Sequence, residues 1–333
     1  MGIDFVILWV DGNDPEWQSE KSKYDSNVND DSNSVSRYRD WGLLPFWFRG
    51  IEKFTPWVNK IHFVTWGHIP EFLNLNNPKL NVVKHTDFIP AEYLPTFSSH
   101  AIELNIHRIP GLSEKFVYFN DDMFIVRNMS EQDFFSQCLP CTYGGEVPIA
   151  FRGDTGIWQH AAVNGMGVIN SHFSKKEQVK GFNMKYINSS YRWQDNVRTF
   201  VLEKLFPDNF LGFKNLHAPG AYLKKTFEDV WEKETDLLNK TSSHKFRSAD
   251  DVNQWVMLWW QIASGRFSPY NTDNLVCSVN ENTVDLVCNA IKNQSNDMIC
   301  VNDGAADTDF QHLSEELKSA FKTILPEKSS FEK

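Results

Sequence analysis

Basic charge, cysteine and long apolar runs are all scarce in this sequence of 333 residues. The formal net charge is −10, which argues against nonspecific nucleic-acid binding, because such binding neutralises phosphates with Lys and Arg. The five cysteines are an odd number in a long chain and fit a reducing compartment better than a disulfide framework. Cys138 and Cys141 have the spacing of a zinc-binding pair, but no second pair follows, so we expect ordinary thiols.

Targeting segments and several common nucleotide or hydrolase motifs are also missing. No apolar run approaches the roughly 20 residues of a membrane helix, and the first residues lack the basic region and the length of a signal peptide. We find no Walker loop, no GxSxG elbow and no GxGxxG fingerprint. We therefore expect a soluble protein in the cytoplasm or at the inner face of the membrane, with peripheral membrane contact at most.

What the sequence does contain is a set of short apolar segments that end abruptly in acids and amides. Three such segments read as buried strands, and the polar residues follow them at 11–14, 120–122 and 302–303. If the strands are parallel and adjacent, these ends converge on one acidic cleft. Carboxylate and amide oxygens there suit Mg²⁺ or Mn²⁺. The alternative is a set of plain polar turns, which Asn, Asp and Gly form routinely.

The order of the predicted elements favours an α/β fold. Strands at 60–65 and 80–84 alternate with an amphipathic helix at 43–54, which predicts a Rossmann-like or GT-A-like, mainly parallel central sheet flanked by helices. Helices at 157–169 and 189–205 indicate a mainly helical second half. We expect one domain over 1–303, with an α/β part at about 1–150 and a helix-rich part at about 151–303. Residues 304–333 then form a tail or a peripheral helix.

Further polar residues are candidates for a site. Ser98 and Ser99 predict a helix over 100–108, which places Glu103 and His107 on one face; they pair with each other, or Glu103 faces the acids after the next strand. Residues 24–36 form a loop that could fold over a ligand. Arg37 and Arg39 could reach phosphate oxygens, although a surface arginine with no special role is the alternative.

The second half contributes an imidazole and a basic cluster. His217 lies in a loop rich in Pro and Gly, where a histidine is well suited to proton transfer near neutral pH. His244, Lys245 and Arg247 precede a helix predicted to start at Ser248 and Asp251, and a helix N-terminus favours anions. The run at 255–260, WVMLWW, is predicted to pack in the core rather than to touch a membrane.

Taken together, these segments resemble the four conserved regions of the Stealth family. The resemblance is carried by IDFVILWVDGNDPEW at 3–17, by 37–73, by LPTFSSHAIELNIHRIPGLSEKFVYFNDDMF at 94–124, by HAPGAY at 217–222 with HKFRSADDV at 244–252, and by CVNDG at 300–304. The family implies transfer of a hexose 1-phosphate from a UDP-sugar to a sugar hydroxyl, with release of UMP and with Mg²⁺ or Mn²⁺. The compact length is similar to that of the bacterial capsular and exopolysaccharide enzymes, which act on a glycan acceptor, free or lipid-linked.

The resemblance also implies roles for particular residues. Asp121 and Asn302 would hold the metal on the pyrophosphate, and Glu103 and Asp122 would be the essential acids. His217 and Arg247 would bind the transferred phosphate. The residues that would line the nucleotide-sugar pocket are Asp11, Gly12, Arg39 and Asp40. One departure is Leu8-Trp9, where the family usually has Thr-Trp.

Two other functions fit the same sequence features. A metal-dependent glycosyltransferase would use the acids on a nucleotide sugar too, but it would cleave at the anomeric carbon and release UDP. A noncatalytic carbohydrate-binding protein would bury as many aromatic residues and would consume no nucleotide sugar.

Overall fold

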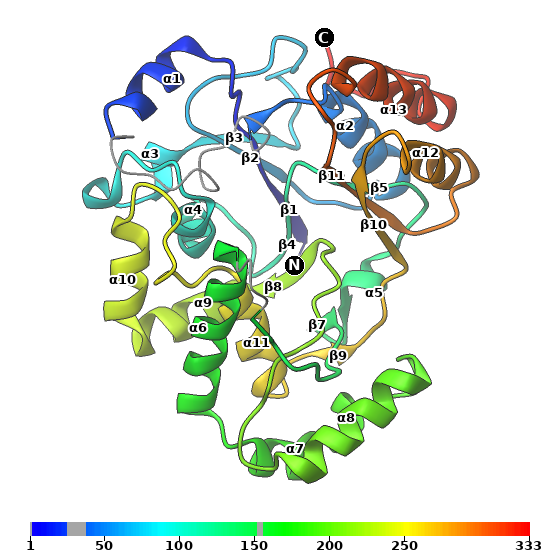
Figure 1. The fold of residues 1–333 in the computed structure, drawn as a ribbon. Helices are drawn as coiled ribbons and strands as arrows, with labels where there is room; N and C mark the ends of the chain where they lie inside the picture. The colour runs from blue at the N-terminus through cyan, green and yellow to red at the C-terminus, as the bar shows by residue number, and fades with distance from the viewer. Residues whose placement is uncertain (1, 25–37, 152–155) are drawn as a thin grey trace.

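The computed structural model describes residues 2–24, 38–151 and 156–333, and its centre is a five-stranded sheet (Figure 1). The strand order is β3-β2-β1-β4-β8. The first four strands run parallel, and β8 pairs antiparallel with β4 at the edge. The strands span Leu80–Lys84 (β3), Ile61–Thr65 (β2), Ile3–Leu8 (β1), Lys115–Phe119 (β4) and Gly220–Leu223 (β8).

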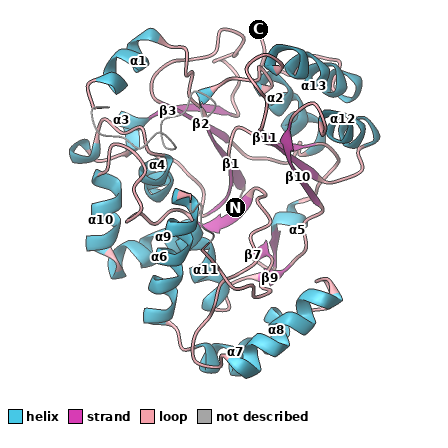
Figure 2. Cartoon of the chain, in the orientation of Figure 1, coloured by secondary structure: helices cyan, strands magenta, loops and turns pink. Residues whose placement is uncertain are grey.

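Helices cover both faces of this sheet, as Figure 2 shows. Side chains alternate along β4, so that Val117 and Phe119 belong to one core cluster while Phe116 and Tyr118 belong to another. The first cluster includes residues of α2 (Leu44–Phe54), α12 (Val284–Asn293) and α13 (Phe310–Ile324). The second includes residues of α4 (Ser99–Asn105), α6 (Ile157–His172), α9 (Lys224–Lys233), α10 (Thr235–Ser243) and α11 (Trp255–Ala263). This architecture confirms the predicted α/β class.

Smaller elements complete the fold. The other helices are α1 (Pro15–Ser22), α3 (His85–Phe88), α5 (Glu131–Phe134), α7 (Lys175–Tyr186) and α8 (Trp193–Leu205), with 3-10 turns at Ala91–Tyr93 and Ile106–Arg108. A small sheet joins β6 (Phe135–Ser136), β7 (Leu139–Thr142) and β9 (Ser268–Pro269). No described helix combines the length and the apolar character that crossing a bilayer requires.

The strand that ends in the polar residues 302–303 lies in a different sheet from the strands that precede 11–14 and 120–122. The three strands are therefore not all adjacent, as their convergence within one sheet would have required. β11 (Met298–Asp303) pairs parallel with β10 (Asn274–Val279) and antiparallel with β5 (Met123–Ile125). β5 follows β4 after the turn that carries Asp121 and Asp122. The end of β11 is therefore brought to these acids through β5 and not through the main sheet.

Three predicted helices differ from the structure, and one of them, predicted over 189–205, begins at Trp193 as α8. α4 ends at Asn105 and a 3-10 turn carries His107, so Glu103 and His107 do not pair: the His107 ring lies against Phe227 and Trp231 instead. α11 begins at Trp255, several residues later than predicted. Its residues Met257 and Trp259 are buried, which confirms core packing for the tryptophan-rich run.

The segment after Gly304 contributes to the core. α13 extends beyond the expected helical pattern at 313–321 and buries Leu313, Leu317 and Phe321. The Phe321 ring stacks on Phe46 of α2, with 5.6 Å between the centroids. This helix therefore covers part of the same cluster that supports β4 and β5.

Candidate active site

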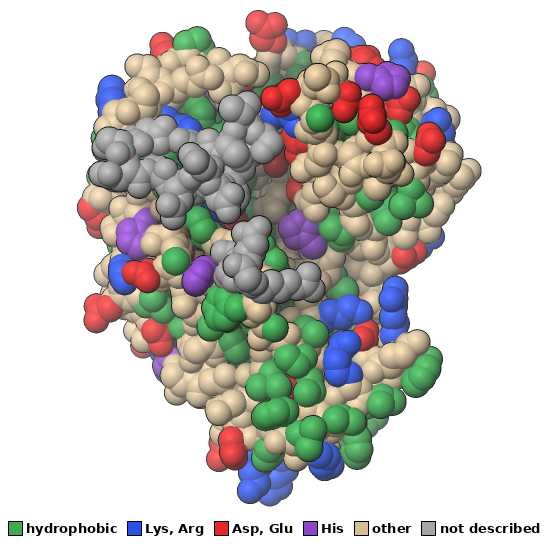
Figure 3. Space-filling view, in the orientation of Figure 1, with side chains coloured by type: hydrophobic (Ala, Val, Ile, Leu, Met, Phe, Trp, Pro, Cys, Tyr) green, Lys and Arg blue, Asp and Glu red, His purple; other side chains and the backbone are tan. Residues whose placement is uncertain are grey.

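The carboxyl ends of β1 and β4 open into one cleft of about 920 Å³. Segments from the first, middle and last parts of the chain line it, and Figure 3 shows the hollow near the middle of the view. All but two of the predicted site residues line this cleft. Those that line it are Arg39, Asp40, Glu103, Asp121, Asp122, His217, Arg247 and Asn302.

Asp11 and Gly12 are the two that do not line the cleft; Trp9 and Val10 line it instead. The Asp11 carboxylate accepts a hydrogen bond from the backbone N–H of Asn13 at 2.9 Å. A Cβ on Gly12 would lie 2.2 Å from the carbonyl oxygen of Tyr38. The close approach of this neighbouring backbone explains the glycine, and contact of the Asp11-Gly12 turn with a nucleotide stays a prediction.

Arg39 forms an ion pair with Asp303, the last residue of β11. Its guanidinium donates two hydrogen bonds to the Asp303 carboxylate, at 2.7 and 2.8 Å, and a third to Asp307 at 2.7 Å. The group also lies over the Phe310 ring. Asp303, one of the acids expected at the cation cleft, thus forms an ion pair with Arg39 and sets its position. The predicted loop at 24–36, apart from Tyr24, and Arg37 lie outside the described residues.

Two adjacent carboxylates, those of Asp121 and Asp122, line the cleft. Asp121 faces the cleft, and close enclosure by the protein, followed by the negative charges of Asp122 and Asp40, raises its pKa to about 7. Burial also raises the pKa of Asp122, while the nearby His217 opposes this shift. The two negative charges therefore repel each other, although Asp121 is exposed to solvent and Asp122 is half-buried.

The donor atoms around these acids fit a hard divalent cation. One buried carboxylate oxygen of Asp122, Oδ1, has no hydrogen-bond partner among the described residues. Asp122, His217 and Cys300 bring ligand atoms within 4.8 Å of one another. Burial and the charge of Asp122 raise the pKa of the Cys300 thiol, so it stays protonated, and its Sγ lies 3.5 Å from Asn302 Oδ1. A protonated thiol is a poor ligand, whereas carboxylate and amide oxygens suit Mg²⁺ or Mn²⁺.

Glu103 lines the cleft in a buried position. Its Oε1 atom is 3.2 Å from the hydroxyl of Tyr118, which also lies 2.7 Å from Asn120 Oδ1. Burial raises the pKa of Glu103, and the charges of His100 and Arg247 oppose the shift. The polar contacts of Glu103 therefore join α4 to the end of β4.

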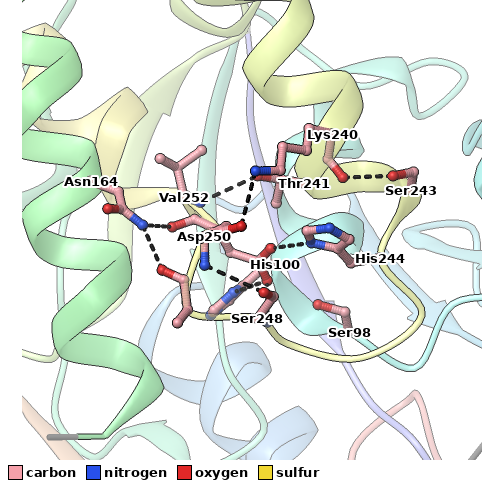
Figure 4. Close-up of polar contacts among 12 residues, drawn as sticks. Ser98, His100, Asn164, Lys240, Thr241, Ser243, His244, Ser248, Asp250 and Val252 are labelled. Atoms are coloured by element: carbon pink, nitrogen blue, oxygen red, sulfur yellow. Dashed lines mark hydrogen bonds and ion pairs between the residues drawn. The ribbon is translucent and has the colours of Figure 1, made fainter. Parts of the chain in front are cut away.

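A buried acid, Asp251, organises the basic segment. Its carboxylate accepts hydrogen bonds from Nδ1 of His100 at 2.9 Å and of His244 at 2.6 Å, as Figure 4 shows for the two imidazoles. It also accepts from the backbone N–H of Ser248 at 2.9 Å. Arg247 in turn donates to the Ser99 hydroxyl at 2.6 Å. This network holds the segment 244–251 against the start of α4, which places Arg247 and His100 in the cleft. We had expected Asp251 only to cap a helix.

His217 lies close to Asp122. Its Nε2 atom is 4.0 Å from Asp122 Oδ2, and its backbone has a left-handed φ of 45°. Asn274, the first residue of β10, donates hydrogen bonds to the carbonyls of Leu216 and His217 at 2.8 and 3.0 Å. This side-chain amide supports an unfavourable backbone conformation. Its role could not be seen in the sequence, because Asn274 is distant from His217 along the chain.

Comparison with known proteins agrees with the resemblance. Two family models match, described as Stealth protein conserved region 1 over residues 1–29 and conserved region 2 over residues 37–140. The capsular polysaccharide phosphotransferase WcwK of Streptococcus pneumoniae is 40% identical over 334 residues, which cover 99% of this chain and 98% of that protein.

Two further relatives are similarly close. The receptor polysaccharide phosphotransferase WefC of Streptococcus gordonii is 40% identical, with 99% of this chain and 98% of that protein covered. An exopolysaccharide phosphotransferase of Lactiplantibacillus plantarum is 36% identical, with 99% and 96% covered. Since these matches span nearly the full length of both proteins, the chain belongs to the Stealth family.

Proposed function

We propose that this protein transfers a hexose 1-phosphate from a UDP-sugar to a hydroxyl of a capsular polysaccharide or exopolysaccharide and releases UMP. The observation that carries the proposal is the convergence of Glu103, Asp122, His217 and Arg247 on one cleft. The relatives named as polysaccharide phosphotransferases support the class of reaction.

The bonds that change are few. The acceptor hydroxyl oxygen forms a bond to the phosphorus that carries the hexose, and the bond from this phosphorus to the oxygen of UMP breaks. The acceptor loses its proton to a carboxylate. Asp122 and Glu103 both lie in the cleft, and both have a raised pKa, which suits a proton acceptor because proton transfer is most effective when the pKa of the base lies closer to the working pH.

Charge on the transferred phosphate is balanced by cationic side chains. Arg247 presents a guanidinium that is held in place through Ser99, and such a group binds phosphate oxygens with two parallel hydrogen bonds. His217 lines the cleft 4.0 Å from Asp122, where an imidazole can hold or donate a proton. Both groups would stabilise the negative oxygens of the transition state.

Asp121 and Asn302 are proposed to hold a divalent cation, with Asp122 beside them. When bound, Mg²⁺ or Mn²⁺ would neutralise the pyrophosphate and make UMP a better leaving group. The repulsion between Asp121 and Asp122 and the unpartnered oxygen of Asp122 are the features that support this assignment. Arg39 and Asp40 would line the donor pocket with the Asp11-Gly12 turn.

The test is incubation of the full chain with a panel of UDP-sugars, Mg²⁺ and a capsular oligosaccharide. We expect UMP in the nucleotide fraction and a new phosphodiester resonance in the phosphorus NMR spectrum of the glycan. Release of UDP with no phosphodiester would establish the alternative, a glycosyltransferase. Absence of any metal-dependent consumption of nucleotide sugar across the panel would indicate a carbohydrate-binding protein.

A further inference from the structure

Helix α8 turns polar residues toward the protein and apolar residues toward solvent, which is the reverse of a normal surface helix. Its buried residues include Asp195 and Thr199, whereas Trp193, Phe200 and Leu205 are 71, 52 and 66% exposed. The exposed apolar residues, Trp193, Val197, Phe200, Val201 and Leu205, are spaced as residues on one helical face. A helix at the protein surface normally turns its apolar face toward the core and its polar face toward water.

The polar inner face is firmly attached to the protein. The Asp195 carboxylate accepts hydrogen bonds from the Tyr143 hydroxyl and from Lys214, both at 2.6 Å. Thr199 accepts one from the backbone N–H of Glu146 at 3.0 Å. These contacts fix which side of α8 faces outward, so the apolar face cannot turn inward without breaking a buried polar network.

The apolar face continues onto the neighbouring helix. Phe182 and Met184 of α7 are exposed, Met184 to 76%, and Phe206 follows the end of α8. Figure 3 shows these hydrophobic side chains as a band over α7 and α8 at the lower edge of the molecule. Extended apolar surface of this kind marks a site of contact with another molecule or a membrane.

Positive charge surrounds this band in an otherwise acidic protein. Residues 176–214 contain seven Lys and Arg against four Asp and Glu, a net charge of +3, although the whole chain carries −10. Lys176, Lys180 and Arg192 are exposed and form no ion pair with the described residues. In Figure 3, basic side chains lie along both the upper and the lower borders of the band.

We propose that this surface, the exposed faces of α7 and α8, docks the protein onto a bilayer that contains anionic lipids. Aromatic and aliphatic side chains on one helical face enter the boundary between headgroups and acyl chains, while flanking Lys and Arg bind the anionic headgroups. A second copy of the chain fits less well, because a symmetric dimer would bring two surfaces of the same positive charge together. The proposal does not depend on the transfer reaction, since it concerns binding without substrate.

Sedimentation with large vesicles tests the proposal on the full chain. We expect binding to vesicles of phosphatidylcholine with about one-third phosphatidylglycerol to be roughly tenfold or more stronger than binding to phosphatidylcholine alone. The double variant Phe200→Asp with Leu205→Asp replaces two exposed apolar residues, and it should lower binding to the anionic vesicles by roughly tenfold or more. Added salt should weaken the binding of the unchanged protein.

The matched control is Leu286→Asp, which makes the same change at a residue 56% exposed on α12, and it should bind as the unchanged protein does. Circular dichroism and thermal melting verify that both variants fold. Equal binding by the double variant and the control would overturn the proposal, as would the absence of any preference for anionic vesicles. Light scattering that shows a dimer dissociated by the double variant would identify the band as an interface between copies instead.

Discussion

The imidazole of His217 lies 4.0 Å from the carboxylate of Asp122, although the two residues are 95 positions apart in the sequence and both line the cleft. Asp122 follows the parallel strand β4, whereas His217 precedes β8, the antiparallel strand beside it. The pairing of β4 with β8 therefore brings the side chains of Asp122 and His217 close together, as the proposed reaction at one phosphate requires.

The change Asp122→Asn keeps the shape of this side chain and removes its charge. We expect the rate of UMP release to fall by roughly 100-fold or more, because loss of a general base typically costs that much. The melting temperature should change little, since an uncharged amide is easier to bury than a carboxylate. The same change at the exposed Asp285 of α12 serves as the control. Near-normal turnover of the Asp122→Asn variant would remove Asp122 from the mechanism.

Asn274→Ala tests whether the backbone at His217 must be held in place. Without the two hydrogen bonds from Asn274, the left-handed conformation of His217 loses its support and the imidazole shifts. We expect kcat to fall by roughly 10- to 100-fold with little change in nucleotide binding. Asn282→Ala, at an exposed position, should have no effect. If the variant turns over normally, His217 either keeps its place unaided or takes no part.

Much of the sheet could be predicted because its strands carry a local signal. Residues 3–8, apart from Asp4, and residues 116–119 are apolar on both faces, as is typical of strands buried between two helical layers, and the structure pairs the two strands in parallel, as the convergence of their ends requires. Acids at such strand ends were predicted to meet. The sheet that contains β11 could not be predicted, because nothing in its own residues specifies antiparallel pairing with β5, a contact between distant segments.

The site was predicted less completely than the sheet. Residues whose chemistry is unusual for their surroundings, such as Asp121 and Asp122, could be recognised along the chain. Asp251 and Asn274 could not, because each acts through hydrogen bonds to residues far away in the sequence. The contact that the sequence could not show at Gly12 is with the backbone of Tyr38, which approaches too closely for any Cβ.

Removal of divalent cations tests whether the reaction requires a cation, and substitution of Asp121 tests whether its carboxylate binds that cation. We expect chelation to abolish turnover and Mg²⁺ or Mn²⁺ to restore it. Asp121→Asn should raise the Mn²⁺ concentration required for half-maximal binding by roughly tenfold or more, because one anionic ligand is lost. Titration of the protein with Mn²⁺, followed by electron paramagnetic resonance, measures this affinity without turnover. Unchanged affinity in the variant would show that the cation binds elsewhere.

Phe321→Ala tests whether the segment after Gly304 belongs to the catalytic domain. Phe321 is fully buried and packs on Phe46 and Phe124, so its removal should lower the free energy of unfolding by about 3–5 kcal/mol. Urea denaturation measures the change. Leu286→Ala, at an exposed residue of α12, should cost less than about 0.5 kcal/mol. A loss at Phe321 no larger than this control would show that α13 is dispensable for the core.

Two buried histidines predict that the protein loses stability in mild acid. Burial lowers the pKa of both His85 and His107 from 6.5 to about 3. Between these values the unfolded chain binds protons that the folded protein does not, so stability is full above pH 6.5 and falls as the pH decreases toward 3. For one histidine, the loss between pH 7 and pH 5 is about 2 kcal/mol.

His107→Leu should remove this contribution, since leucine has no proton to bind and suits the apolar contacts with Phe227 and Trp231. Urea denaturation at pH 7 and pH 5 should then show a smaller difference for the variant than for the unchanged protein, by about 2 kcal/mol. His312→Leu is the control, because His312 lies on the exposed face of α13 and is 75% exposed in its side chain. The same acid sensitivity in both variants would mean that His107 is protonated in the folded state, or that carboxylates alone determine the response to acid.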